Sequence, residues 1–199
     1  MKQVTWKKIP LMEAIDYEQP NPYIVNTKIK DSGKHPVLTP GKSFIKGYTD
    51  ESEGLYTETP AIIFDDFTTA SKYVDFDFKV KSSAMKILKP KNKDVNLKYV
   101  FYQMSLVKIN ASTHKRYYIS TYQNKPFLFP FNNASLDMDA QNHLVDEIET
   151  QFTRLDAAIK TLRAIREKLE SYRKSVLNEA FSLKDTCKKS TIGESNTFI

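Results

Sequence analysis

The sequence predicts an α+β fold, in which a globular domain of mixed short strands and helices is followed by one long coiled-coil-forming helix. Two observations carry this prediction. Short apolar runs separated by proline and glycine turns occupy residues 4–131, as is typical of short strands and helices. Residues 141–183 then contain neither proline nor glycine, and apolar side chains recur there every seven residues. Such a repeat indicates a helix that supercoils against a second helix, and about forty residues would make a rod of roughly 60 Å.

The first strands are predicted from short apolar patterns. Residues 4–15 alternate and predict a strand that leads into a turn of helix. Residues 36–39 predict a strand, because a Pro-Gly turn signal follows them. Residues 49–58 read as an acidic loop, and the compact run Ala-Ile-Ile-Phe at 61–64 predicts a buried strand.

Two more strands are predicted after this buried run. Residues 73–81 alternate between apolar and charged side chains, which predicts a half-buried antiparallel strand. Its apolar face would carry Phe76, Phe78 and Val80. Its solvated face would carry Asp75, Asp77, Lys79 and Lys81. Residues 84–88 predict a further strand, which Pro90 closes.

One helix and an extended segment complete the expected domain, and the long helix follows it. Residues 96–109 have apolar side chains at helical spacing, and Asn96 is placed to cap this helix. Residues 127–131 form an extended apolar run before the long helix. Asp137 or Asp139 would cap the long helix itself.

The composition is that of a soluble protein, with 40% hydrophobic residues, 27% charged residues and a mean hydropathy of −0.50. No apolar run is long enough to span a membrane, and residues 1–8 lack the apolar core of a signal peptide. The single cysteine, Cys187, excludes an intrachain disulfide and is interpreted as an incidental thiol. A cytoplasmic protein is therefore expected.

The net charge of +6 lies mainly in the expected globular part. Residues 1–140 contain nineteen lysines and one arginine, Arg116, against fifteen acidic residues, whereas residues 141–181 are neutral. The surplus fits either a polyanion-binding surface or charge that serves solubility. If the domain reads DNA bases, Arg116 is its one arginine for a bidentate contact with guanine.

The number and spacing of the histidines and glycines argue against a metal site and a phosphate-binding loop. The three histidines, His35, His114 and His143, are isolated, and no two glycines lie close enough for a phosphate-binding loop. No cofactor and no metal site are expected. Asp66 followed by Asp77-Phe78-Lys79 faintly resembles a magnesium-dependent nuclease pattern, and this alternative stays open as the weakest.

Short hydroxyl, amine and aromatic side chains cluster in three polar segments, and such side chains suit phosphate and base contacts in DNA. The alternative is a set of solvated turns with tyrosines in the core. The candidate DNA-binding residues are Thr68, Thr69, Ser71, Lys72, Lys81, Ser82, Ser83, His114, Lys115, Arg116 and Tyr117.

Four blocks together resemble the specificity subunits of type I restriction–modification systems. Residues 60–74 (PAIIFDDFTTASKYV), 78–88 (FKVKSSAMKIL) and 112–118 (STHKRYY) resemble parts of the target recognition domain of that family. Residues 141–181 resemble its helical spacer, in particular at EIETQFTRLDAA, which begins at Glu147.

The resemblance implies a non-catalytic protein that reads one half of a split target in double-stranded DNA. Partner modification (methyltransferase) and restriction (translocase and nuclease) subunits would supply methylation, translocation and cleavage. It also implies a target recognition domain at 1–140 and a spacer helix at 141–181, which we expect to be dimerising. Residues 182–199 are polar, and we expect a flexible tail there. The usual subunit has two recognition domains and two antiparallel spacers, whereas this chain has one of each. Residues 132–138 also replace a short Leu-Pro-Pro-Leu segment that is usual in the family.

We therefore expect a half-length subunit that forms a homodimer through its helix, with Arg166 and Arg173 at the edge of the apolar row. Two alternatives remain: a truncated fragment that binds or sequesters a partner subunit, and the nuclease. The expected dimer interface consists of Ile148, Phe152, Leu155, Ile159, Leu162, Ile165, Leu169, Tyr172 and Val176.

Overall fold

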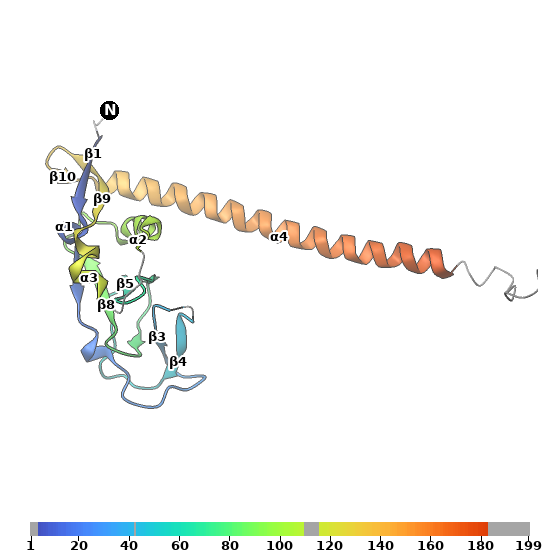
Figure 1. Cartoon of the computed structure of the whole chain (residues 1–199), viewed down its shortest axis with the longest axis horizontal. Coiled ribbons are helices and arrows are strands. Elements are labelled where there is room, and N and C mark those ends of the chain that lie inside the picture. Colours follow the sequence, from blue (N-terminus) through green and yellow to red (C-terminus); the bar gives the residue numbers. More distant parts are fainter. Residues whose placement is uncertain (1–3, 42, 110–115, 183–199) are drawn as a thin grey trace, which may run out of the picture. The chain divides into compact units, whose positions relative to one another are not determined.

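The computed structural model describes residues 4–41, 43–109 and 116–182. These residues form two compact units, of which the first ends at Glu147 and the second begins at Ile148. The first unit contains strands, short helices and the start of the long helix (Figure 1). Among the described residues, no helix is both long and apolar enough to cross a membrane.

The elements follow the expected α+β order. In the first half of the chain they are β1 (Val4–Pro10), α1 (Leu11–Ala14), β2 (Ile15–Glu18), η1 (Asn21–Tyr23), β3 (His35–Leu38), β4 (Ile45–Thr49), β5 (Ala61–Asp65), β6 (Ser71–Val74), β7 (Lys79–Val80) and β8 (Met85–Pro90). In the second half they are α2 (Leu97–Leu106), α3 (Tyr117–Ser120), η2 (Tyr122–Asn124), β9 (Pro126–Asn132), β10 (Ser135–Leu136) and α4 (Met138–Ser182).

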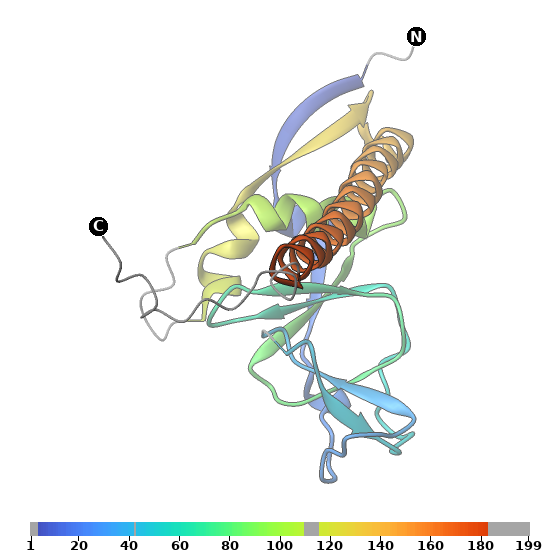
Figure 2. The same cartoon turned by 90° about the vertical axis from the view of Figure 1, so that its right-hand side faces the viewer.

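Three sheets build the first unit. The central sheet has the strand order β2-β8-β5-β6, and all its pairs are antiparallel. A sheet of order β4-β3-β7 and a ribbon of β1, β9 and β10 accompany it. Figures 1 and 2 show the β3–β4 pair at one end of this unit and the ribbon of β1 and β9 at the other.

The central sheet is buried on both faces, which explains the continuous apolar run of β5. Ile62 and Phe64 face one hydrophobic core, which includes residues of α1, α2, α3 and β9. Ala61 and Ile63 face a second core that reaches β3 and β7. A strand with apolar packing on both faces loses the alternation of a half-exposed strand.

Side-chain caps determine where the two longer helices begin. Asn96 Oδ1 accepts a hydrogen bond from the Tyr99 amide at 3.1 Å, so the expected cap of α2 is confirmed. Asp137 Oδ1 accepts from the Ala140 amide at 3.0 Å, which makes Asp137 the cap of α4. Gln141, fully buried, ties this first turn to the domain by accepting from the Asn96 amide and donating to the Asp94 carbonyl.

The prediction of one continuous strand at 73–81 is wrong. The segment contains the end of β6, which pairs with β5, and β7, which pairs in parallel with β3 in another sheet. Phe78 and Val80 are buried as expected, but Phe76 is exposed. Lys79, expected on a solvated face, is also buried. The segment changes sheets between residues 74 and 79, and a two-residue periodicity does not register such a change.

Candidate nucleic-acid interface

The turn between β5 and β6 is built by the carboxylate of Asp65. Asp65 Oδ1 accepts hydrogen bonds from the amides of Phe67 at 2.8 Å and Thr68 at 2.9 Å. The Thr69 amide donates to the Asp65 carbonyl at 3.0 Å, and Thr69 has a left-handed φ of 60°. These bonds hold the hydroxyls of Thr68 and Thr69 in one defined turn, because each orders a backbone group next to them.

Asp66 joins this turn to both other candidate segments. Its amide donates to the Ala84 carbonyl at 3.3 Å, next to Ser82 and Ser83. Its own carbonyl accepts from the Tyr117 amide, and its Oδ1 accepts from the Tyr118 amide, each at 2.8 Å. Three segments that are separated in sequence therefore meet at one residue, which is 3% exposed.

A buried lysine faces Asp66. Lys86 Nζ lies 3.8 Å from Asp66 Oδ2 and donates to Gln19 Oε1 at 2.9 Å. Burial lowers the pKa of the Lys86 ammonium from its ordinary value, Asp66 opposes this shift, and the positive charge of Arg116 adds to it. Asp66 therefore supplies the opposite charge for a buried ammonium and at the same time anchors the backbone after Arg116.

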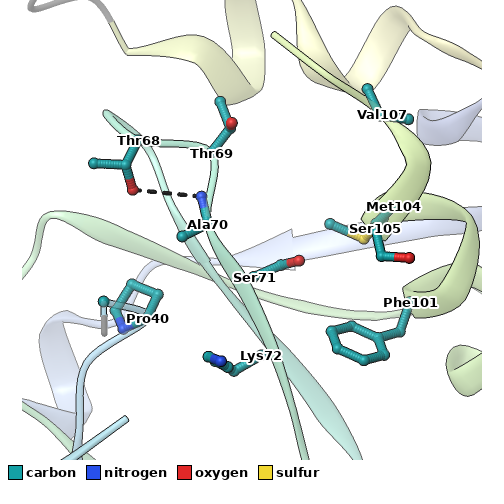
Figure 3. Close-up of a pocket in the computed structure, with 11 residues that line it drawn as sticks. Pro40, Thr68, Thr69, Ala70, Ser71, Lys72, Phe101, Met104, Ser105 and Val107 are labelled. Atoms are coloured by element: carbon teal, nitrogen blue, oxygen red, sulfur yellow. Dashed lines mark hydrogen bonds between the residues drawn. The ribbon is translucent and has the colours of Figure 1, made fainter. Parts of the chain in front are cut away.

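A hollow of about 560 Å³ lies beside the turn of β5 and β6 (Figure 3). One wall carries four of the candidate residues, Thr68, Thr69, Ser71 and Lys72. The opposite wall consists of residues of α2 and its C-terminal end: Phe101, Met104, Ser105 and Val107. The hollow thus combines hydroxyls and an ammonium with an aromatic ring, which are groups suited to phosphate and base or sugar contacts.

The other candidate residues differ in exposure. Lys81 and Ser83 are exposed beyond the end of β7, where the Lys81 amide donates to the Leu38 carbonyl at 3.1 Å. Arg116 is exposed directly before α3. Tyr117 is 8% exposed, so little of its side chain is accessible, and its contact with DNA stays a prediction. His114 and Lys115 lie outside the described residues.

The tyrosines after Arg116 contribute to the core, as the alternative interpretation of that segment predicted. Tyr118 and Tyr122 are 1% exposed, and their rings lie 5.4 Å and 4.7 Å from the Phe64 ring between centroids. Aromatic packing of this kind fixes α3 and η2 against β5. The exposed Arg116 therefore projects from a rigid base.

The geometry does not favour the nuclease alternative. Asp66 is engaged with Lys86 and Tyr118, whereas Lys79 Nζ pairs with Glu51 Oε2 at 2.8 Å. Within the described ranges, no group of three His, Cys, Asp or Glu side chains could hold a metal ion. Asp66 and Lys79 of this pattern thus have separate partners.

Lys79 and Glu51 lock the acidic loop onto β7. Lys79 Nζ also donates to the Glu53 carbonyl at 2.6 Å, and Glu51 accepts from the amides of Asn26 and Thr27. At Gly54, where φ is +60°, a Cβ atom would overlap the Pro22 carbonyl oxygen, so the loop needs glycine there. The hydrogen bond from Lys79 is the main reason that the pKa of Glu51 falls to about 2, and the bond from Thr27 adds to it.

Glu51→Gln should destabilise the fold by about 3 kcal/mol at neutral pH, because the buried Lys79 ammonium loses its carboxylate. A lowered folded-state pKa stabilises the fold above the ordinary value of 4.5, and this contribution disappears as the pH falls through about 2. The difference between wild type and variant should therefore shrink between pH 4.5 and pH 2 in urea titrations. Asp50→Asn removes the exposed pair with Lys30 and should change the midpoint little. A difference independent of pH would contradict the assignment.

The second unit presents its apolar stripe to solvent. Ile148 is half-buried, and the other eight predicted interface residues are between 37% and 70% exposed. Residues 151–182 are all exposed. A contiguous apolar row of this length on a charged helix marks an interaction surface.

The chain is similar to the specificity subunit of the type I restriction enzymes EcoR124I and EcoR124II from Escherichia coli, with 43% identity over 178 residues. The match covers 85% of this chain and 43% of that protein. Over most of its length the chain therefore resembles part of a type I restriction enzyme specificity subunit. The chain thus spans less than half the length of this relative. No family model matches the chain.

Solved structures of type I systems share the fold of this specificity-subunit homologue. The S subunit from M. genitalium superposes with a TM-score of 0.57 at 18% identity, over 93% of this chain and 49% of that one. A chain from a structure of type I complex assembly and conformational transition gives a TM-score of 0.66 at 11% identity, over 88% of this chain and 45% of that one. The fold of this chain, mixed short strands and helices with a long C-terminal helix, is therefore found in these structures.

Sequence patterns missed the residues that assemble the site. Asp65, Asp66 and Lys86 organise the candidate segments, and Phe101 and Met104 form the far wall of the hollow. One signal was available, since two consecutive aspartates directly after a buried strand are typical of a side-chain-stabilised turn. No local pattern would have placed Lys86 opposite Asp66.

Proposed function

We propose that this chain is the DNA-recognition subunit of a type I restriction–modification system and reads one half of a bipartite target. The 43% identity to a specificity subunit carries this proposal. The chain itself performs no catalysis; modification and restriction subunits bound to it methylate, translocate and cleave DNA. Such a role places the protein in the cytoplasm, with the DNA.

The recognition surface we propose is centred on the Asp66 region. The hollow beside α2 supplies Lys72 and the two threonine hydroxyls, and Arg116 supplies the planar guanidinium. Lys81, Ser82 and Ser83 extend the surface, because Ala84 is bonded to Asp66. Lysines and hydroxyls would hold phosphates, while Arg116 would read a base edge.

We propose further that two copies associate through the stripe of α4. A monomer would leave the whole row from Phe152 to Val176 in water, and a two-fold dimer buries the same row on both chains. Two identical domains then read two inverted half-sites at a separation that the paired helices determine.

Selection from a pool of random duplex DNA tests the proposal directly. The purified chain should enrich two inverted half-sites with one fixed spacer. Enrichment of a single half-site would contradict the dimeric arrangement. Failure to enrich any sequence, together with co-purification of a modification subunit, would instead support a sequestering fragment.

Lys72→Ala should weaken binding about equally on all sequences, because a lysine at a phosphate contributes no base discrimination. In a plot of the logarithm of the binding constant against the logarithm of the salt concentration, the negative slope should become shallower by about one for each recognition domain. Fluorescence anisotropy at several salt concentrations measures both quantities. Lys93→Ala is the matched control, since Lys93 is exposed on the loop before α2, away from the hollow. An unchanged slope for Lys72→Ala would remove Lys72 from the interface.

Arg116→Lys should keep most of the overall affinity and lose discrimination at one base pair in each half-site. The charge survives the change, but the planar fork that bonds two acceptors of guanine does not. Each lost bidentate contact should reduce discrimination by about 1–3 kcal/mol. Competition between the selected site and its single-base variants measures this. An equal loss on all sequences would assign Arg116 to a phosphate.

A further inference from the structure

The hollow beside the turn of β5 and β6 is divided by β6, the outer strand of the central sheet. Ser71 pairs with Phe64 and Lys72 pairs with Ile63, so the side chains of Ser71 and Lys72 lie on opposite faces of the sheet. Figure 3 shows the Ser71 hydroxyl directed toward α2 and the Lys72 side chain directed away from it. The hollow therefore has an α2 side, with Ser71, Phe101, Met104 and Val107, and a Lys72 side, with Lys72 and Pro40.

The α2 side is largely apolar, and its aromatic ring is held in place. Phe101 and Val107 are partly exposed, whereas Met104 is buried behind them. The centroid of the Phe101 ring lies 6.1 Å from that of Tyr73 and 5.9 Å from that of Tyr102. Aromatic packing of this kind fixes the orientation of a ring. A ligand on this side therefore meets a preformed apolar wall.

One hydroxyl faces this wall from β6. Among the described residues, the Ser71 hydroxyl has no hydrogen-bond partner. The hydroxyl of Ser105, on α2, differs because it donates its proton to the Tyr102 carbonyl at 2.6 Å. A serine hydroxyl can donate one hydrogen bond and can also accept. Ser71 can therefore donate to an acceptor that lies next to the apolar wall.

A phosphate does not suit the α2 side. Apolar side chains cannot replace the water that an anion loses on binding. In addition, α2 ends at Leu106, and the C-terminal end of a helix carries partial negative charge. The ammonium of Lys72 lies on the other side of β6, so a phosphate fits there instead.

Thymine is the base whose edge matches the α2 side. In the major groove it presents a methyl group on C5 next to the acceptor O4. The other three bases present polar groups there and no methyl group. A polar edge against Phe101 and Val107 would lose its water without compensation. Only thymine thus offers an apolar group to the wall and an acceptor to Ser71.

We propose that the α2 side of the hollow reads one thymine of each half-site. The C5-methyl group packs against Phe101 and Val107, and O4 accepts a hydrogen bond from the Ser71 hydroxyl. This inference rests on the DNA-recognition function proposed above and names one base pair that the domain reads. Arg116 reads a different base pair, since it precedes α3 and does not line the hollow. Lys72 holds a backbone phosphate on the opposite face of β6.

Thymine analogues test the methyl contact without any change in the protein. In one half-site of the selected duplex, each thymine is replaced in turn by uracil, which lacks only the methyl group. A second series carries 5-bromouracil, which has an apolar atom of similar size at C5. At one position uracil should weaken binding about fourfold, as expected for one buried methyl group, and 5-bromouracil should restore the affinity. Fluorescence anisotropy measures each duplex.

Protein variants assign that position to the hollow. Phe101→Ala should abolish the difference between thymine and uracil there, and the preference due to Arg116 should persist. Val107→Ala should reduce the same difference and changes the packing of α2 less. Ser71→Ala should weaken binding about fivefold on the thymine and uracil duplexes alike, because both bases carry O4. Ser135→Ala is the matched control, since it removes an exposed hydroxyl on β10, outside the hollow.

The outcomes separate this inference from the function on which it rests. A chain that enriches no sequence would overturn the recognition function itself. A defined half-site in which no thymine responds to uracil would overturn only the thymine contact. The same holds for a uracil effect that stays equal in wild type, Phe101→Ala and Val107→Ala. Equal affinities of Ser71→Ala and Ser135→Ala on every duplex would remove Ser71 from the contact.

Discussion

Asp66→Ala should lower the free energy of unfolding by about 3–5 kcal/mol, the largest stability loss that we expect from one exchange in the recognition domain. The change leaves the Lys86 ammonium, 1% exposed, without its carboxylate, and it removes the acceptor of the Tyr118 amide. Urea titration at a fixed protein concentration measures the loss. Asp16→Ala breaks the exposed pair with Lys91 and should change the midpoint little.

Two further variants separate the charge from the anchoring of the backbone. Asp66→Asn keeps an oxygen for the Tyr118 amide but loses the negative charge, so it should cost less than Asp66→Ala. Adding Lys86→Met to Asp66→Asn should recover part of the loss, because no unpaired charge is then buried. Equal stability of the single and double variants would contradict the ion pair. DNA binding at a temperature where each variant is folded would show whether the Arg116 segment needs this anchor.

Leu162→Asp should convert the chain to a monomer in sedimentation at micromolar concentration. In the proposed dimer Leu162 belongs to the apolar row that both copies bury, so the exchange places two carboxylates in that interface. The fold of the single chain should be unaffected, because Leu162 is 64% exposed. Two domains that no longer act together should bind the complete bipartite site about 10²–10⁴-fold more weakly.

Thr161→Asp is the control for this prediction. It adds the same charge one residue away, on the outer face of the helix, and should leave both dimerisation and DNA affinity near wild type. A Leu162→Asp chain that remains dimeric would contradict an interface built on the stripe. A monomeric chain with unchanged affinity for the bipartite site would contradict the joint reading of two half-sites.

The elements that sequence patterns predicted correctly are those specified within a few residues. Asn96 and Asp137 cap their helices through bonds that reach three residues along the chain. The apolar run of β5 and the heptad row of α4 are likewise local periodicities. Local patterns left open whether the polar segments form a DNA-binding surface or solvated turns. Similarity to a known family favoured the DNA-binding surface.

The errors share one physical cause. Residues 73–81 alternate like one strand, but β6 and β7 belong to different sheets. Lys79 is buried because its ammonium pairs with Glu51 and donates to the Glu53 carbonyl. Alternation of apolar and polar residues along a chain indicates the two faces of a strand, but it does not indicate which other segments cover each face.

By itself the sequence determined the α+β class, the long helix with its seam, and the polar segments that suit DNA, because these depend on short-range order and composition. Only the tertiary structure decided that three of those segments meet at Asp66. Its bonds to Ala84, Tyr117 and Tyr118 join residues up to 52 positions apart, and a buried lysine supplies the opposite charge. Contacts over such separations depend on how the sheets close around a common core, which no local pattern encodes.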